Sequence, residues 1–411
     1  MTRITRVAAI ALLALGAAAS PVHAQGAPVP SLPDPEQIGR FHLGPIRFTP
    51  SVQISELGVD SNVFNETADP KQDTTVRVGP EVEFWGRLGP RALLYGSTSI
   101  DYQYFRRYES QRSFGTTNIA RIDLDVGRLR PFAEGAFTST RVRPGFEIDE
   151  RARREESFGR AGLGILLFSR TQLVAWGRAA RHRYNASEEF LGQSLADALD
   201  RDAETLGTGL EVELTPLTTF VVSGEFQQDR FVRSPERNAD SVKVTPGFRF
   251  KPFALIDGTV YVGYRRFETL SPLVPDYSGV AAAVNLGYTL RATRFVGRFN
   301  RDVTYSYETI EPYYLQTDWS LDVTQKITRR WDVVGRGGTY TLDYQRISAA
   351  GSEGRKDRGK LFGGGLGYLL GEHVRFGVDV DYLDRRSDTD ITRTYDNVRA
   401  GASITYGLKQ P

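Results

Sequence analysis

Segments in which apolar and polar residues alternate strictly recur along most of the chain. The segment His373–Leu383 is the clearest, because every second residue from Val374 to Tyr382 is apolar and the intervening residues are charged or glycine. A period of two predicts a β-strand with one apolar face and one polar face. Comparable segments follow one another from about residue 45 to the end of the chain, so repetition of this pattern is the main signal in the sequence.

The connections between these segments alternate in length. Short ones rich in Gly, Pro or Ser, such as 88–91, 128–131 and 370–372, alternate with longer charged stretches, such as 145–156 and 384–393. Tight turns favour these residue types. About eight short turns and nine long loops predict an all-β fold, a transmembrane antiparallel up-and-down β-barrel of about 18 strands. The short turns are expected on the periplasmic side and the longer loops outside, with the barrel spanning residues 45–411.

Two places interrupt the alternation. The phase changes around Gly335–Gly338, and Arg301 falls on the apolar side of its strand. A β-bulge, or a strand end above the bilayer, is expected at both positions. The predicted number of strands therefore holds to within about two.

The N-terminus has the features of an export signal. Arg3 and Arg6 precede the apolar run Val7–Ala19, and a small-residue site ends at Ala24. Residues 1–24 are therefore predicted to be a secretory signal peptide, since the run is too short to span a bilayer. Residues 25–44, with four prolines, are expected to form a periplasmic lead-in. The expected location is the outer membrane of a Gram-negative bacterium.

Loss of the signal peptide changes the charge balance. The chain has 52 Lys and Arg residues against 50 Asp and Glu residues, and two of the basic residues are Arg3 and Arg6. The mature chain is then formally neutral, which does not favour nucleic acid as a partner. The expected partners are outer-membrane lipid and lipopolysaccharide, the barrel-assembly machinery and, for an export role, a periplasmic polysaccharide-export complex.

The polar strand faces hold the candidate pore lining. Lipid accepts only the apolar face, because a midplane Arg or Lys costs roughly 2–4 kcal/mol there. A barrel of 16–18 strands encloses an aqueous channel, and wall charges can select permeants. The alternative is that the charges only solvate and stiffen the wall. The candidates are Arg77, Glu81, Glu83, Asp101, Arg121, Asp123, Glu211, Glu213, Lys243, Arg249, Arg265, Asp318, Asp322, Lys326, Arg375, Asp379, Asp381 and Arg399.

Residues for catalysis or metal binding are scarce. The chain has no cysteine, which excludes disulfides, thiol nucleophiles and thiolate metal sites. His182, near the outer end of a strand, is the one candidate for a hydrolase, but no Ser or Asp partner is identifiable. The glycine run Gly363–Gly367 lies within a strand pattern, so close packing is expected there and not a phosphate loop. No enzymatic activity, metal or cofactor is predicted.

Two long connections stand out. Ser187–Ala203 has apolar residues at helical spacing, so it is predicted to contain a short amphipathic helix with Ser187 as N-cap. It would either constrict the pore as a gate or cap the outside. The Arg/Glu-rich stretch Arg141–Glu156 is expected to be a solvated loop. The candidate gate residues are Ser187, Phe190, Leu191, Leu195 and Leu199.

Aromatic residues gather near the loop ends of several strands, including Tyr102, Tyr264, Tyr314, Tyr340 and Tyr344. Rings at that depth suit a girdle at the membrane–water interface. Ordinary β-propensity of Tyr is the alternative explanation.

The start of the predicted barrel carries a motif. Phe48–Val52 (FTPSV), followed by Gly58–Phe64 (GVDSNVF), resembles the opening of the Putative beta-barrel porin 2 family, and the strand-pair pattern continues over residues 45–408. The resemblance implies an outer-membrane barrel without enzymatic activity, some of whose relatives are associated with exopolysaccharide export. Asp60 and Asn62 are expected to close the first loop with side-chain-to-backbone bonds.

Three classes of function follow from these observations. The first is a channel for solutes or for a secreted polysaccharide; lumen charges favour ionic solutes, and aromatic residues would favour sugars. The second is a structural or adhesive surface protein whose barrel is closed by its loops. The third, with His182 as its only support, is an outer-membrane lipid hydrolase.

Overall fold

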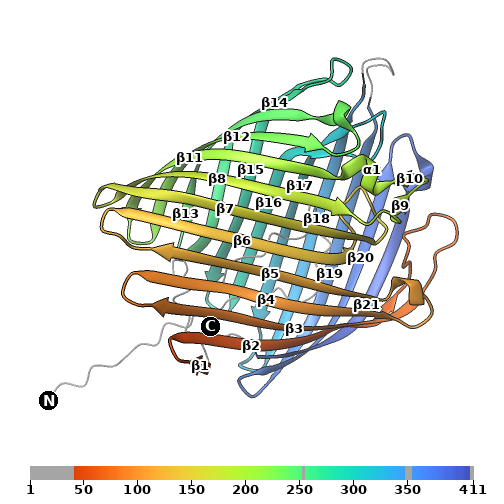
Figure 1. Ribbon diagram of the computed structural model, residues 1–411. Helices are drawn as coiled ribbons and strands as arrows, with labels where there is room; N and C mark the ends of the chain where they lie inside the picture. Colours follow the sequence, from red (N-terminus) through yellow and green to blue (C-terminus); the bar gives the residue numbers. More distant parts are fainter. Residues whose placement is uncertain (1–40, 252–254, 348–353, 408–411) are drawn as a thin grey trace.

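The computed structural model describes residues 41–251, 255–347 and 354–407 as a single closed barrel (Figure 1). Each strand pairs antiparallel with its neighbours in sequence order, and β2 pairs with β21 to close the wall. The predicted architecture and the number of 18 strands are confirmed. The barrel strands are β2 (Ile46–Asp60), β3 (Asp73–Leu88), β4 (Ala92–Phe105), β5 (Ser113–Leu124), β6 (Leu129–Val142), β7 (Ala152–Phe168), β8 (Thr171–Tyr184), β11 (Arg201–Thr215), β12 (Thr218–Phe231), β13 (Ala239–Phe250), β14 (Ile256–Thr269), β15 (Tyr277–Leu290), β16 (Thr293–Tyr305), β17 (Tyr313–Lys326), β18 (Trp331–Gln345), β19 (Lys356–Leu370), β20 (Val374–Ser387) and β21 (Tyr395–Tyr406).

A short strand precedes the barrel. β1 (Phe41–Leu43) forms a hairpin with the start of β2, and the rings of Phe41 and Phe48 stack at 5.6 Å. β1 falls within the stretch predicted as the lead-in. The predicted signal peptide and the rest of the lead-in lie outside the described residues. None of the helices within the described ranges has the length and apolar character needed to cross a membrane.

The two faces of the wall differ as the alternation predicts. On β20, Val378 and Val380 lie on the outer face and are 59% and 50% exposed. Asp381 lies on the inner face, and its side chain is only 16% exposed. Apolar side chains occupy the outer face of most other strands in the same way. An apolar outer band with a polar interior is what a lipid environment requires.

Neither of the two predicted irregularities is a β-bulge. The β17–β18 register runs without a shift past Gly335–Gly338, so the bulge expected there is wrong; glycines on both faces simply erase the alternation. Arg301 is the last residue of β16 that pairs with β15, and it donates to Thr317 Oγ1 at 2.6 Å. A bulge lies instead in β2, around Glu56, which has a φ of 53°.

The girdle prediction is wrong for several of the tyrosines. Tyr314 and Tyr344 are 2% and 1% exposed, and they pack with Leu342 and with Phe146 of the β6–β7 connection. The β6–β7 connection folds inward, and the inward-facing tyrosine rings pack against its apolar residue Phe146. Tyr264, in contrast, is half exposed on the outer face. The main apolar clusters of the protein therefore lie beneath the loops, at the end of the barrel where Figure 1 labels α1, β9 and β10.

Candidate functional site

Most of the predicted pore-lining residues meet one another, or a partner, on the inner wall. Several pairs join strands that are not direct neighbours, such as Lys243 of β13 with Asp302 of β16 (3.8 Å), so these side chains must share the concave face. Their role in lining a conducting pore stays a prediction. The ion pairs are Arg77–Asp101 (3.4 Å), Arg121–Asp123 (2.8 Å), Arg249–Glu211 (2.9 Å), Lys251–Glu213 (3.7 Å), Lys243–Glu225 (3.5 Å), Arg265–Asp302 (2.7 Å), Arg298–Asp322, Arg336–Asp379 (2.5 Å), Arg336–Asp381 (3.2 Å), Arg375–Asp332 (2.5 Å) and Arg399–Asp60 (3.3 Å).

The remaining four candidates lie on the same face. Glu81 and Glu83 of β3 are opposite Ser99 and Ser97 of β4. Asp318 accepts hydrogen bonds from Gln316 (2.7 Å) and Asn300 (3.2 Å). Lys326 of β17 is directly opposite Asp332 of β18.

The glycine run of β19 makes room for these pairs. A Cβ on Gly365 would lie 2.3 Å from Asp379 Oδ1, and one on Gly363 would lie 1.9 Å from Asp381 Oδ1. Without side chains at these positions, Arg336 of β18 reaches across β19 to both aspartates of β20. The glycines thus give space to charged side chains of the two flanking strands.

Replacing Gly365 by leucine is expected to lower the stability of the barrel by about 1–3 kcal/mol, because the new side chain overpacks the site and separates an ion pair. Urea unfolding in detergent micelles, followed by tryptophan fluorescence, measures the change. Gly364→Leu is the matched control, since its Cβ faces outward and meets only Val334 O at 3.4 Å. Equal losses in both variants would contradict this account of the glycine run.

The β6–β7 connection, residues Arg143–Arg151, crosses the barrel opening and is called the plug segment below. The ring of Phe146 stacks on Tyr340 of β18 with 3.9 Å between centroids, and the backbone oxygens of Phe146 and Glu147 accept from Arg385 of β20 at 2.8 and 2.9 Å. The strands β5, β4, β3, β2 and β21 separate β6 from β20 along the wall. The prediction of a solvated loop over Arg141–Glu156 is therefore wrong.

Arg385 anchors the plug segment electrostatically. It is fully buried, and besides the two backbone oxygens it donates to the carboxylates of Asp149 (2.7 Å) and Asp357 (2.5 Å). A buried guanidinium needs such acceptors, because an unpaired buried charge costs several kcal/mol. Asp149 belongs to the plug segment and Asp357 to β19, so Arg385 ties the plug segment to the wall.

Glu147 is the most buried acidic group of the plug segment, with 2% of its surface exposed. Its carboxylate accepts from the Ser306 hydroxyl (2.6 Å) and from the backbone N–H of Tyr307 (3.2 Å), both in the β16–β17 loop. Burial raises the pKa of Glu147 to about 7, although the bond from Ser306 and the charge of Arg393 act in the opposite direction. The group therefore changes charge near neutral pH.

The predicted gate loop joins this arrangement, but its helix is shorter than expected. Residues 189–194 form a small hairpin of β9 (Glu189–Phe190) and β10 (Gln193–Ser194). Helix α1 covers only Leu195–Leu199, and its N-cap is Ser194, which accepts from Asp197 N at 3.2 Å. Ser187 as N-cap is thus wrong, since its hydroxyl donates to Asn185 in a turn. The hairpin contains residues 189–194, which the helical spacing had predicted to be part of the helix.

Most of the apolar candidate gate residues in this loop are buried, and one is exposed. Phe190, Leu195 and Leu199 are buried against Ile148 of the plug segment and against Tyr307. Leu191, at the hairpin turn, has a φ of 48° and is 57% exposed. The loop therefore folds inward and packs on the plug segment.

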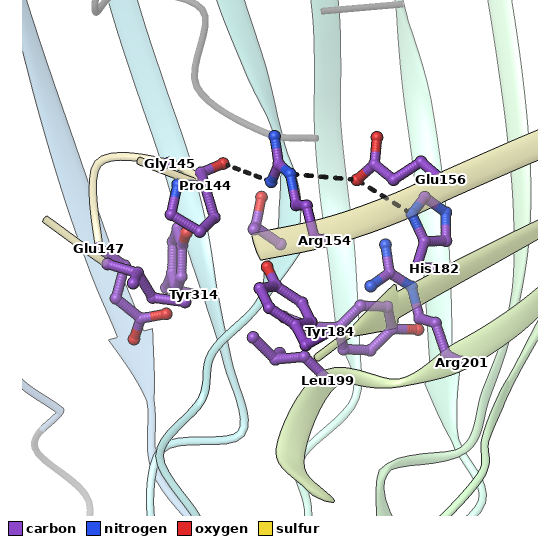
Figure 2. Close-up of a pocket in the computed structure, with 13 residues that line it drawn as sticks. Pro144, Gly145, Glu147, Arg154, Glu156, His182, Tyr184, Leu199, Arg201 and Tyr314 are labelled. Carbon is purple, nitrogen blue, oxygen red and sulfur yellow. Dashed lines mark hydrogen bonds and ion pairs between the residues drawn. The ribbon is translucent and has the colours of Figure 1, made fainter. Parts of the chain in front are cut away.

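His182 lies inside the barrel, at a cavity of about 170 Å³ beneath the plug segment (Figure 2). Its Nδ1 is 3.3 Å from Glu156 Oε1, and Arg154 links Glu156 to Pro144 O, to which it donates at 3.1 Å. The described lining of this cavity has no serine. Within the described part of the chain, no group of three or more His, Cys, Asp or Glu residues could hold a metal.

Two larger cavities, of about 360 and 340 Å³, lie deeper along the inner wall. They share Lys243, Asn300 and Asp302, and the second also reaches Arg160 and Trp176. Polar and charged side chains predominate in both linings, so hydrated solutes fit them better than apolar ones.

The motif at the start of the barrel is structural, as expected. Asp60 Oδ1 accepts from Asn62 N (3.1 Å), and the Asn62 side chain donates to Glu66 O and accepts from Glu66 N (2.8 and 2.9 Å). Asn397 of β21, fully buried, donates to Asp60 at 2.9 Å. The motif closes the first loop and fixes it to the last strand.

The chain is similar to several known proteins. The family model of Putative beta-barrel porin 2 matches residues 36–407. No curated protein sequence matches the chain significantly. Similar solved structures include OccK2 (OpdF) of Pseudomonas aeruginosa (11% identity, 88% of this chain, 98% of that chain, TM-score 0.49), a BenF-like porin from Pseudomonas fluorescens Pf-5 (9%, 88%, 99%, 0.46) and a bacterial polysaccharide outer membrane secretin (10%, 88%, 98%, 0.34). The fold and the family imply an outer-membrane location. With its family model matched over almost the whole barrel, the chain belongs to the Putative beta-barrel porin 2 family.

Proposed function

We propose that this protein is an outer-membrane channel for small charged solutes, and that the plug segment restricts its opening. The observation that carries the proposal is the inner wall, where ion pairs surround cavities of about 340 and 360 Å³ below the loops. Charged walls around water-filled space select and pass polar solutes. The outer wall would contact lipid and lipopolysaccharide, and insertion would need the barrel-assembly machinery.

Three other functions receive less support. A channel for a polysaccharide, with a periplasmic export complex as partner, would be expected to carry a track of aromatic residues. The inner wall below the loops instead carries mainly charged residues. A closed structural or adhesive protein is favoured by the buried contacts of the plug segment, such as those of Arg385. A hydrolase would use His182, which faces the interior and is engaged by Glu156.

Planar bilayers separate these functions. The purified protein is expected to give discrete conductance steps that increase in size or frequency when the plug segment is loosened. A barrel that stays silent at all voltages, both as the wild type and with the plug segment removed, would exclude the channel and favour the structural protein.

A further inference from the structure

Charged residues that face each other directly on neighbouring inner-wall strands usually have opposite signs. Such pairs stabilise a sheet, whereas like charges in direct opposition destabilise it. One like-charged pair, Lys243 and Arg265, is bridged by Asp302, at 3.8 and 2.7 Å. The directly opposed pairs of opposite sign are Arg121–Glu134, Glu225–Lys243, Asp322–Arg336, Lys326–Asp332 and Asp381–Arg399.

Arg160 of β7 and Arg178 of β8 depart from this rule. They are directly opposed in the register. Among the described residues, neither has a carboxylate within 4.0 Å, and neither side chain donates a hydrogen bond. Glu134 lies opposite Arg160 on its other side, but its carboxylate pairs with Arg121 at 3.2 Å. The two arginines thus face each other in the register, and neither has a carboxylate partner within 4.0 Å among the described residues.

Aromatic rings hold both guanidinium groups in place. The Arg160 guanidinium lies 4.2 Å from the ring centre of Trp176 and 5.4 Å from that of Phe132, and Arg178 lies 4.6 Å from that of Phe158. A guanidinium stacked on a ring keeps its N–H groups, which point outward in its own plane. Those N–H groups match the two oxygens of a carboxylate.

Space for a ligand is next to Arg160. Arg160 and Trp176 line the cavity of about 340 Å³, whose other charged residues are already engaged, such as Arg249 with Glu211 and Lys243 with Glu225. We propose that Arg160 and Arg178, supported by Trp176 and Phe158, form a binding site for the carboxylate of a small organic anion. An anion there would remove the repulsion between the two arginines.

This site would make carboxylate-bearing solutes the permeant class of the proposed channel. For the passage of the ligand, the inference therefore rests on the proposed function. Binding itself does not depend on conduction. A solute of the size of a sugar acid suits the cavity, with the carboxylate at the arginines and the hydroxyl groups toward the polar wall.

Equilibrium binding tests the site directly. In a background with Trp85, Trp319 and Trp331 replaced by phenylalanine, Trp176 becomes the only fluorophore of its kind, since the chain has four tryptophans. Glucuronate is expected to change its fluorescence at a concentration about tenfold lower than glucose, which lacks the carboxylate. Electrophoretic heat modifiability confirms that each variant is folded.

Three variants decide the outcome. R160Q/R178Q should abolish the preference for glucuronate, whereas R160K/R178K, which keeps the charge but not the planar fork, should retain only part of it. R181Q should behave like the parent protein, since Arg181 of β8 faces outward with its side chain 76% exposed. Equal responses to glucuronate and glucose in the parent protein, or an undiminished preference in R160Q/R178Q, would overturn the proposal.

Bilayer recordings separate this site from the proposed function. In a salt gradient, the reversal potential should indicate preference for anions in the wild type and a smaller preference in R160Q/R178Q. If the barrel never conducts but the binding preference is present and depends on the arginines, the channel fails and the site stands. If the barrel conducts without that preference, the site fails and the channel stands.

Discussion

Replacing Arg385 by glutamine is expected to release the plug segment and to raise the single-channel conductance several-fold. The substitution removes the charge that joins Asp149 of the plug segment to Asp357 of the wall, and both carboxylates lie in buried surroundings. Breaking a buried ion pair by removing one partner typically costs 3–5 kcal/mol. The closed arrangement should lose about 3 kcal/mol relative to an open one in which both carboxylates regain water. That loss shifts the balance between the two arrangements by roughly two orders of magnitude.

Bilayer recordings of R385Q measure this effect, and limited proteolysis within 143–151 reports release of the segment independently. R386Q is the matched control, because Arg386 follows Arg385 on β20 but is 58% exposed and pairs with Asp384 at 2.6 Å. A folded R385Q barrel with wild-type conductance and a protected plug segment would show that Arg385 does not hold it.

Raising the pH from 5 to 8 is expected to favour the open arrangement. In the closed barrel the pKa of Glu147 is raised to about 7 by burial, whereas a solvated glutamate has a pKa near 4.5. Below about 4.5 the group is neutral in both arrangements. Between about 4.5 and 7 the closed barrel keeps a proton that the open one releases, so the stability of the closed arrangement falls as the pH rises. The loss is complete above 7 and amounts to on the order of 3 kcal/mol.

Conductance recorded between pH 5 and pH 8 tests this sign and window. E147Q should remove most of the pH dependence, because glutamine keeps the hydrogen-bonding shape without the titration. Part of the dependence should persist, since burial also raises the pKa of Glu150, within the plug segment, and of Glu311, in the β16–β17 loop. The control E155Q, on the exposed face of β7, should show the same pH dependence of conductance as the wild type. Conductance that falls as the pH rises would refute the assignment.

The barrel was predictable because each strand carries its own information. A wall residue faces either lipid or the interior, so β20 reveals both faces within the segment Val374–Tyr382. The charged inner positions follow from the same alternation. Their partners are harder to identify, since Asp302 pairs with Lys243 three strands away and with Arg265 two strands away. That choice depends on the curvature of the closed wall.

The plug segment could not be predicted from local sequence. Its residues 147–151 are mostly charged, which is typical of a solvated loop. Burial becomes possible only through Arg385 and Arg393, which lie more than 230 residues away in sequence and satisfy its carbonyl and carboxylate groups. Proline and glycine at positions 144 and 145, beside the apolar Phe146 and Ile148, were the only local sign of a turn with something to bury. Helical spacing in the loop 187–203 was misleading for a related reason, because its apolar residues are spaced to meet Ile148 and Tyr307.

A reversible cross-link between the plug segment and the wall tests most directly whether this segment closes a channel. The rings of Phe146 and Tyr340 stack at 3.9 Å, and the chain has no cysteine of its own, so F146C/Y340C in the R385Q background introduces a single reactive pair. A short bifunctional methanethiosulfonate reagent should lower the conductance of the opened channel to the wild-type level, and a reductant should restore it. Conductance that is unchanged by a verified cross-link would contradict the proposal that residues 143–151 restrict the opening.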